Sequence, residues 1–224
     1  MKYRHELKYI ISSSQAEILK QRLSLVMDLD KYSVNQDHTY LIRSLYFDDL
    51  YSSSYYEKLD GVLYRKKYRI RIYNNDDKFI RLECKYKHNN MTSKEQAIID
   101  KDICMKLING DTDIVTEDRL LNRFIIEMKT KHLVPSVIVD YKRLAYTYPL
   151  SKVRITFDSN IKSGRYNYDL FDKNSIFYNV IEDNMVVLEV KFNEVLPLHI
   201  ATILETIPSF RQAVSKYALC REVK

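Results

Sequence analysis

The feature that most constrains this chain is a set of segments in which charged and apolar side chains alternate. The clearest is 64–73 (YRKKYRIRIY), where the basic residues Arg65, Lys67, Arg69 and Arg71 occupy every second position. A period of two is typical of a β-strand whose two faces meet different surroundings. Four more segments alternate in the same way, namely 4–8, 79–87, 152–160 and 185–192. Two further runs, 41–48 and 135–147, are rich in β-branched and aromatic residues and also predict strands.

Helical patterns lie between these strands. Residues 12–28 and 116–131 carry apolar side chains at helical spacing and begin with capping or acidic residues. Shorter helices are expected after Asp100, over 197–206 and over 215–223. The sequence therefore predicts an α+β protein, and its 224 residues (1–224) suit a single domain.

Charged faces on several strands have two explanations. A solvated outer face is the ordinary one for a single strand. A sheet closed on itself, polar inside and covered outside by helices, produces the same pattern, and the amphipathic helices here would supply that cover. An interior lined by many cations needs an anion with several closely spaced charges, because desolvated like charges repel one another. Phosphate oxygens meet this need, since arginine binds them bidentately and lysine binds them as a point charge.

Three pairs of residues spaced two apart are the sharpest local features. Arg69 and Arg71 lie roughly 7 Å apart along one strand face, a spacing suited to neighbouring phosphates. Glu83 and Lys85 repeat an acid–base pair that recurs at Glu189 and Lys191. Each acid–base pair is either a cross-strand ion pair or a carboxylate that holds Mg²⁺ or Mn²⁺ beside a phosphate-binding lysine.

Composition excludes several classes of protein. The chain has only three glycines, Gly61, Gly110 and Gly164, so no glycine-rich phosphate loop of a Walker ATPase, a Rossmann dehydrogenase or a kinase can be formed. Three cysteines form no C-x-x-C pair, and neither a signal sequence nor an apolar run of 18 residues occurs. We therefore expect a cytoplasmic protein that does not insert into a membrane.

The net charge of +6 favours a polyanionic partner. Nucleic acid is not expected, because the aromatic residues fall on the faces opposite the basic ones.

Eight short motifs, taken in order, resemble the vacuolar transporter chaperone (VTC) domain. This is the polyphosphate polymerase domain of the CYTH, or triphosphate tunnel metalloenzyme, superfamily. The resemblance runs from residue 3 to about residue 221. The motifs are ELKY (6–9), RSLYFDD (43–49), RIRIY (69–73), LECKYK (82–87), VDYKR (139–143), VRITFD (153–158), LEVKF (188–192) and SKY (215–217).

The resemblance implies a fold, a reaction and a set of site residues. The fold is a closed, antiparallel eight-stranded β-barrel tunnel with a basic interior and helices packed outside. The reaction moves the γ-phosphate of ATP onto a polyphosphate chain, with Mn²⁺ or Mg²⁺ as cofactor. The implied catalytic residues are Arg69, Arg71, Arg154, Lys191 and Glu189, and Glu189 is also the implied metal ligand. The implied phosphate-binding residues are Lys8, Lys85, Lys94, Tyr141, Arg143, Ser215 and Lys216.

Two departures from related proteins affect this interpretation. Many tunnel triphosphatases begin with E-x-E-x-K, whereas this chain has Arg4, Glu6 and Lys8 in that register, one acid short. The loss favours the polymerase branch. The eukaryotic polymerases also carry an SPX domain and transmembrane helices; we expect a stand-alone bacterial form here, which leaves room for a membrane partner. Two alternatives stay open: hydrolysis of tripolyphosphate or a nucleoside triphosphate in the same tunnel, and a non-catalytic polyphosphate- or nucleotide-binding module.

Overall fold

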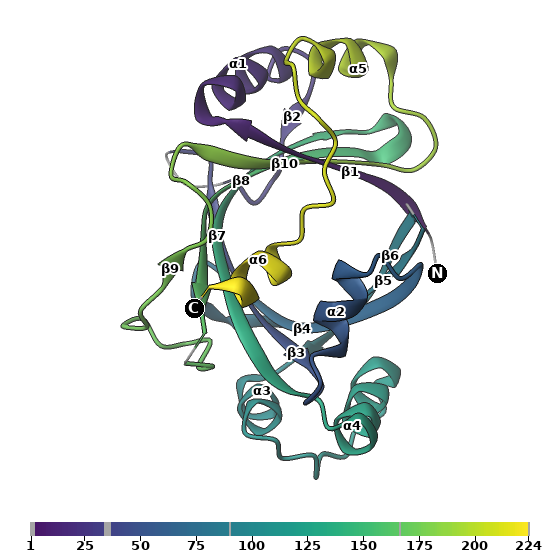
Figure 1. Ribbon diagram of the computed structural model, residues 1–224, viewed down its shortest axis with the longest axis vertical. Helices are drawn as coiled ribbons and strands as arrows, with labels where there is room; N and C mark the ends of the chain where they lie inside the picture. Colours follow the sequence, from purple (N-terminus) through teal and green to yellow (C-terminus); the bar gives the residue numbers. More distant parts are fainter. Residues whose placement is uncertain (1–2, 34–36, 90, 166, 224) are drawn as a thin grey trace.

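A ring of eight antiparallel strands forms the centre of the computed structural model, which describes residues 3–33, 37–89, 91–165 and 167–223 (Figure 1). Each strand pairs with the next, and the last pairs with the first. In order round the ring the strands are β7 (Val134–Tyr148), β3 (Tyr40–Asp48), β4 (Tyr64–Tyr73), β5 (Asp76–His88), β6 (Met91–Ile99), β1 (Arg4–Ser12), β10 (Met185–Phe192) and β8 (Val153–Gly164). The two-residue strands β2 (Asp28–Leu29) and β9 (Tyr178–Asn179) extend the sheet beside β7 and β8. The predicted α+β class and the eight-stranded antiparallel arrangement are confirmed.

The ring is held unevenly. Most neighbouring strands share long ladders; β3 and β7, for example, pair over nine residues of β3. Within the described ranges, strands β1 and β6 share two residue pairs, Arg4 with Thr92 and His5 with Met91. Among the described residues, this junction has the shortest ladder round the ring.

Four helices cover the outside of the ring on two opposite sides (Figure 1). On one side lie α1 (Ser13–Leu23) and α5 (Leu198–Glu205), and on the other lie α3 (Lys101–Ile108) and α4 (Arg119–Lys131). Local sequence fixes where three of them begin. Ser12 and Gln15 form a capping box at α1, and the side chains of Asp100 and Asp118 accept backbone hydrogen bonds at the starts of α3 and α4.

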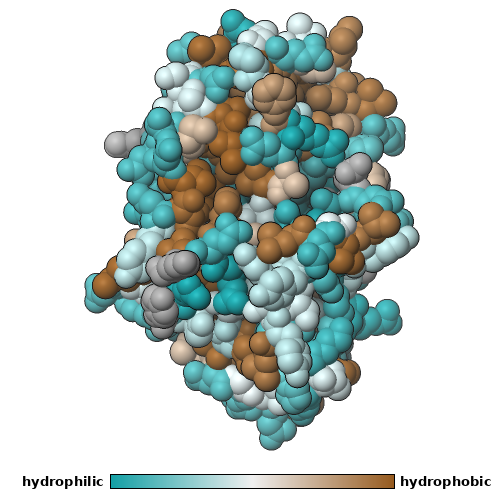
Figure 2. Space-filling model, viewed as in Figure 1, coloured by the Kyte–Doolittle hydropathy of each residue, from teal (hydrophilic) through white to brown (hydrophobic). Residues whose placement is uncertain are grey.

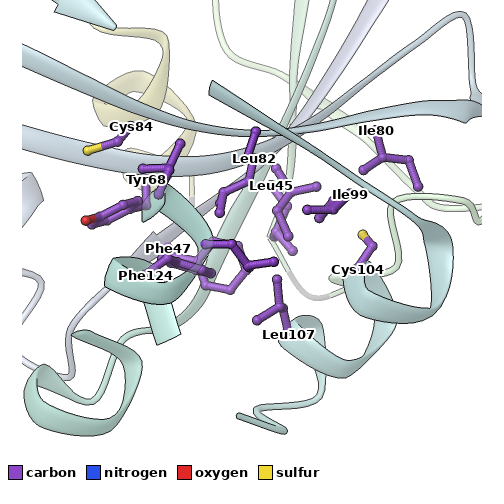
Figure 3. Packing of buried hydrophobic residues seen from close by; sticks show 14 of the residues in the cluster. Leu45, Phe47, Tyr68, Ile80, Leu82, Cys84, Ile99, Cys104, Leu107 and Phe124 are labelled. Atoms are coloured by element: carbon purple, nitrogen blue, oxygen red, sulfur yellow. The ribbon is translucent and has the colours of Figure 1, made fainter. Parts of the chain in front are cut away.

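The described residues form three hydrophobic clusters: two lie on the outer face of the strands, and a third joins Val139 and Tyr141 of β7 to Tyr217 near the end of the chain. Beneath α3 and α4, Phe47 and Phe124 meet edge to face with ring centroids 4.9 Å apart, and Leu82 packs beside them (Figure 3). Beneath α1 and α5, the second core includes Leu19 and Ile155. Where a strand packs its apolar side beneath these helices, its alternate side chains face the inside of the ring.

Two further helices lie at the opening of the ring (Figure 1). They are α2 (Ser53–Leu59), which the sequence pattern did not predict, and α6 (Lys216–Glu222). The expectation that all helices pack outside is wrong for α6, because Lys216 at its start reaches the interior. The chain leading to α6 crosses the opening: the Gln212 amide donates to the Lys8 carbonyl at 2.9 Å, and Lys8 Nζ donates to the Val214 carbonyl at 3.0 Å.

The outer surface and the remaining short element complete the fold. A single 3₁₀ turn, η1 (Leu150–Lys152), connects β7 to β8. Figure 2 shows a hydrophobic patch at the upper right, over α5 and the loop before it, where Val195 and Leu198 are exposed. The lower half of the same face is mostly hydrophilic. Across the described ranges, no helix has both the length and the apolar character needed to cross a bilayer.

Candidate functional site

The inside of the ring holds a cavity of about 480 Å³ whose lining is strongly basic. Strand alternation is the cause, since every second residue of β4 from Arg65 to Arg71 points inward. Among the described residues, twelve basic side chains and two carboxylates, Glu6 and Glu189, line it. The twelve are Lys8, Lys58, Arg65, Lys67, Arg69, Arg71, Lys85, Lys87, Arg143, Lys191, Arg211 and Lys216.

Most of the residues expected from the sequence meet in this cavity. Ten of the twelve line it: Lys8, Arg69, Arg71, Lys85, Tyr141, Arg143, Glu189, Lys191, Ser215 and Lys216. Their roles toward a ligand stay predictions.

The other two residues lie outside the cavity lining. The Arg154 guanidinium lies 2.9 Å from Asp30 and donates to the Tyr40 hydroxyl at 2.8 Å. Lys94 lies directly opposite Lys85 on the β5–β6 ladder and so shares the inner face of the strands, where its Nζ lies 2.5 Å from Glu83. Contact between either side chain and a ligand in the cavity would require it to leave its carboxylate.

Glu83 supports the two arginines of the RIRIY motif from the adjacent strand, β5. Its side chain is fully buried, with Arg69 at 2.6 Å and Arg71 at 3.8 Å. Burial alone would raise the pKa of Glu83, but the positive charges of Arg69, Arg71 and Lys94 outweigh it and hold the pKa well below its ordinary value. Of the two interpretations of Glu83 drawn from the sequence, the cross-strand ion pair is the one observed, because Glu83 lies directly opposite Arg69. Its effect is to fix the direction of the arginine.

Glu189 is the meeting point of the basic side chains deeper in the cavity. Lys191 lies 2.6 Å from its carboxylate and Lys216 lies 3.0 Å away, with Lys8 at 3.4 Å and Arg143 at 3.7 Å. Burial disfavours the charged carboxylate, yet these cations hold the pKa of Glu189 well below its ordinary value. Burial also lowers the pKa of Lys191 to about 7, despite the opposing effect of Glu189. The Glu189 carboxylate is therefore ionised at neutral pH, and the Lys191 ammonium group titrates near neutral pH.

Asp158 is a buried acid that the sequence analysis did not single out. It binds Arg143 through two short contacts, at 2.5 and 2.6 Å, and it lies 2.6 Å from Lys216. Alternation in the segment 152–160 already placed Asp158 on the polar strand face, which was the available signal. Asp158 thus fixes one arginine and the helix α6 lysine relative to each other.

Glu6 fixes the position of Lys85, a cavity-lining residue of β5. Lys85 Nζ lies 2.7 Å from both carboxylate oxygens of Glu6, and Lys8 Nζ lies 3.2 Å from one of them. Lys8 therefore contacts both cavity carboxylates, Glu6 and Glu189.

Three tyrosines also line the cavity: Tyr46, Tyr141 and Tyr217. The Tyr46 hydroxyl accepts a hydrogen bond from Arg69 at 2.8 Å, and the Tyr141 hydroxyl accepts one from Arg71 at 3.2 Å. The expectation that aromatic and basic residues occupy opposite faces is wrong for these three. The hydroxyl groups of Tyr46 and Tyr141 hold the two arginines in place, whereas the Tyr217 hydroxyl donates to Asp48.

Five lining cations were not among the predicted site residues: Lys58, Arg65, Lys67, Lys87 and Arg211. Alternation did identify the polar faces that carry Arg65, Lys67 and Lys87, but no motif marked them as functional. Lys58 comes from α2, whose sequence gives no helical pattern.

The donor set suits a divalent cation held jointly with a ligand. In the described part of the chain no three acidic, histidine or cysteine side chains form a metal cage. Glu189 and Glu6 nevertheless face the cavity, and Mg²⁺ is commonly bound by one or two carboxylates together with substrate phosphates. These two carboxylates are the groups that could hold Mn²⁺ or Mg²⁺.

Comparisons with known proteins agree with this geometry. The family model of the VTC domain matches residues 3–223. A Bacillus halodurans protein whose proposed assignment is adenylate cyclase has a similar structure, with a TM-score of 0.50, 13% identity, and coverage of 92% of this chain and 89% of that one. The Schizosaccharomyces pombe Mediator head module (TM-score 0.48, 10% identity, 91% and 90% covered) and PH1819 of Pyrococcus horikoshii OT3 (0.42, 11%, 91% and 85%) are more distant. Among curated proteins, no sequence matches the chain.

Proposed function

Because this chain belongs to the VTC domain family, we propose that it is a polyphosphate polymerase, which transfers the γ-phosphate of ATP to a polyphosphate chain in the ring cavity. Family membership supports a role in polyphosphate or triphosphate chemistry. The observation that carries the finer proposal is the cavity itself, whose twelve basic side chains exceed its two carboxylates sixfold. Few ligands other than a multiply charged anion would offset that excess.

The reaction needs no side-chain nucleophile. A terminal oxygen of the polyphosphate chain attacks the γ-phosphorus of ATP. The bond from that phosphorus to the β,γ-bridging oxygen breaks, and ADP leaves with the electron pair. Such phosphoryl transfer depends on positioning and on neutralising charge. Arg69, Arg71 and Arg143 bind the reacting phosphates.

Preorganisation supports these roles. Arg69 is held by Glu83 and Tyr46, and Arg71 by Ser44 and Tyr141. Guanidinium groups fixed before the ligand arrives lose less conformational entropy on binding and need not reorganise as charge develops.

Glu189 and Glu6 would hold the divalent cation together with phosphate oxygens. When bound, Mn²⁺ or Mg²⁺ would supply further neutralisation of phosphate charge. The chain's own contribution is to present Glu189 ionised and to place Lys191 and Lys216 beside the same phosphates.

Incubation of the purified protein with ATP and Mn²⁺, with and without a short polyphosphate primer, tests the proposal. Gel analysis should show chains that lengthen with time while ADP is released. Orthophosphate without chains would overturn the polymerase in favour of a tunnel triphosphatase. No turnover, with a melting temperature raised by tripolyphosphate, would leave a binding module.

A further inference from the structure

Apart from Arg211, the cations that line the cavity form two groups, which differ in whether carboxylates neutralise their charge. Every member of the first group lies within ion-pair distance of Glu6, Glu83, Asp158 or Glu189; the members are Lys8, Arg69, Arg71, Lys85, Arg143, Lys191 and Lys216. The second group, called here the outer cluster, consists of Lys58, Arg65, Lys67 and Lys87. Within the described ranges, none of these four forms an ion pair with a carboxylate.

Strand register makes the outer cluster unfavourable by itself. Lys67 lies directly opposite Lys85 on the β4–β5 ladder, and Arg65 lies directly opposite Lys87. Like charges in directly opposed positions destabilise a sheet. The next position along the ladder, by contrast, sets Arg69 against Glu83. Two consecutive like-charge pairs on one inner face call for an anion from outside the chain.

A second, independent observation concerns the ammonium group of Lys67. Its Nζ is buried and has no hydrogen-bond partner among the described residues, and it lies 4.2 Å from the centroid of the Tyr217 ring. A buried ammonium group without an acceptor is costly. Lys58, from α2 at the ring opening, faces the same space.

The outer cluster also lies where two cavities meet. Arg65 and Lys87 line the ring cavity and, in addition, a second cavity of about 540 Å³ bordered by α2, α4 and the ends of β4 and β5. Among the described residues, the lining of this second cavity has as many carboxylates as cations, and its Lys66 and Lys131 both pair with Glu127. The excess of positive charge therefore lies on the outer cluster itself, at the boundary of the ring cavity.

We propose that the outer cluster is a second anion site, which holds a stretch of linear polyphosphate beyond the acid-lined part of the cavity and without a divalent cation. This inference rests on the proposed function and names where its long-chain substrate lies. The inward row from Arg65 to Arg71 spans roughly 20 Å by strand rise, which is longer than a triphosphate.

Proton uptake is the expected accompaniment. Burial and the neighbouring charge of Arg65 lower the pKa of Lys67 to about 7, and burial and Arg65 lower that of Lys87 to about 8. The groups that face Lys67 are Lys58, Lys8, Arg65 and Asp48, together with the Tyr217 ring. An anion on the outer cluster favours the charged lysines, so binding takes up protons at neutral and mildly alkaline pH.

Calorimetric titration in EDTA with linear long-chain polyphosphate and with tripolyphosphate tests the site. The variant is R65Q/K87Q, and the control K78Q/K106Q removes two exposed lysines elsewhere. Relative to the affinity for tripolyphosphate, the long-chain affinity of R65Q/K87Q should fall at least about tenfold. The control ratio should change less than about threefold, because distant exposed charges are screened. An unchanged ratio in R65Q/K87Q would overturn the inference.

Two further readouts keep the outcome unambiguous. Without any anion, R65Q/K87Q should melt at a higher temperature than the wild type, because like-charge repulsion is removed; a lower melting temperature would contradict the inference. The chain-length assay separates the two proposals. Wild-type elongation with an unchanged affinity ratio refutes the outer cluster alone. No elongation, with the ratio lost in R65Q/K87Q, refutes the polymerase and retains the site.

Discussion

Replacement of Glu83 by glutamine tests whether this buried acid holds Arg69 and Arg71 in place. The substitution keeps the shape of the side chain and removes its charge, while Arg69, Arg71 and Lys94 stay around it. Removing one partner of a buried ion pair costs about 3–5 kcal/mol, because the other charge is left unpaired. We expect about 3 kcal/mol, the lower end of that range, because Lys94 is 29% exposed and can turn toward water.

Urea unfolding at pH 7 measures this difference. A loss of about 3 kcal/mol corresponds to a melting temperature lower by roughly 6–12 °C for a chain of this size. The matched control is E95Q on the adjacent strand, whose partner Arg123 is 38% exposed, so that its loss should stay below about 1 kcal/mol.

The effect should also depend on pH in one direction. The pKa of Glu83 in the folded protein lies below its ordinary value of 4.5, so the stability that its charge supplies is present above pH 4.5 and is lost as pH falls through the folded pKa. Equal stability of E83Q and wild type at pH 7 would refute the view that Glu83 is needed to support the arginines.

Three further predictions concern ligands. The affinity for long-chain polyphosphate should rise as pH falls from about 9 to about 7 and then level off, because Lys67 and Lys191 have pKa values of about 7 that a bound anion raises. Calorimetry in buffers of different ionisation enthalpy would show proton uptake, and a pH-independent affinity would contradict the prediction. E189Q should abolish metal-dependent turnover but retain binding of tripolyphosphate in EDTA, and full turnover would remove Glu189 from the metal site. R71A should weaken tripolyphosphate binding by about 1.5–3 kcal/mol, whereas an unchanged dissociation constant would show that Arg71 does not contact the ligand.

Strand alternation made much of the fold readable. Segments 64–73 and 185–192 were predicted with the bounds that β4 and β10 have. The pattern is strong there because one face of each strand packs on a hydrophobic core and the other faces a charged interior. Strand β6 was missed, because its polar residues continue onto its outer face, where Glu95 pairs with Arg123 of α4.

Elements without a buried face leave no periodic signal. Helix α2 buries none of its residues, and the residue before it, Ser52, has a positive φ of 57° with no capping hydrogen bond from its side chain. The first amides of α2 donate instead to the side chains of Asp48 and Asp49, which lie before the usual cap position, and no amphipathic stripe marks the helix. Its Lys58 could not be assigned to the cavity for the same reason.

The candidate site was predictable as a set of strand faces but not as a set of contacts. Alternation placed Arg154 on a polar face, as it did Asp158, yet Asp158 supports Arg143 while Arg154 pairs with Asp30 outside the cavity lining. Which member of a face reaches a cavity depends on strand tilt and on the neighbouring loop. Those are tertiary properties that a period of two does not contain.

The central claim is that the protein transfers the γ-phosphate of ATP to the end of a polyphosphate chain in the ring cavity. ATP labelled on its γ-phosphate, incubated with the protein, Mn²⁺ and a polyphosphate primer, follows that group directly. We predict that the label enters acid-insoluble chains in step with ADP release, and that E189Q leaves it in ATP. Label recovered only as orthophosphate would contradict the claim, because water would then be the acceptor.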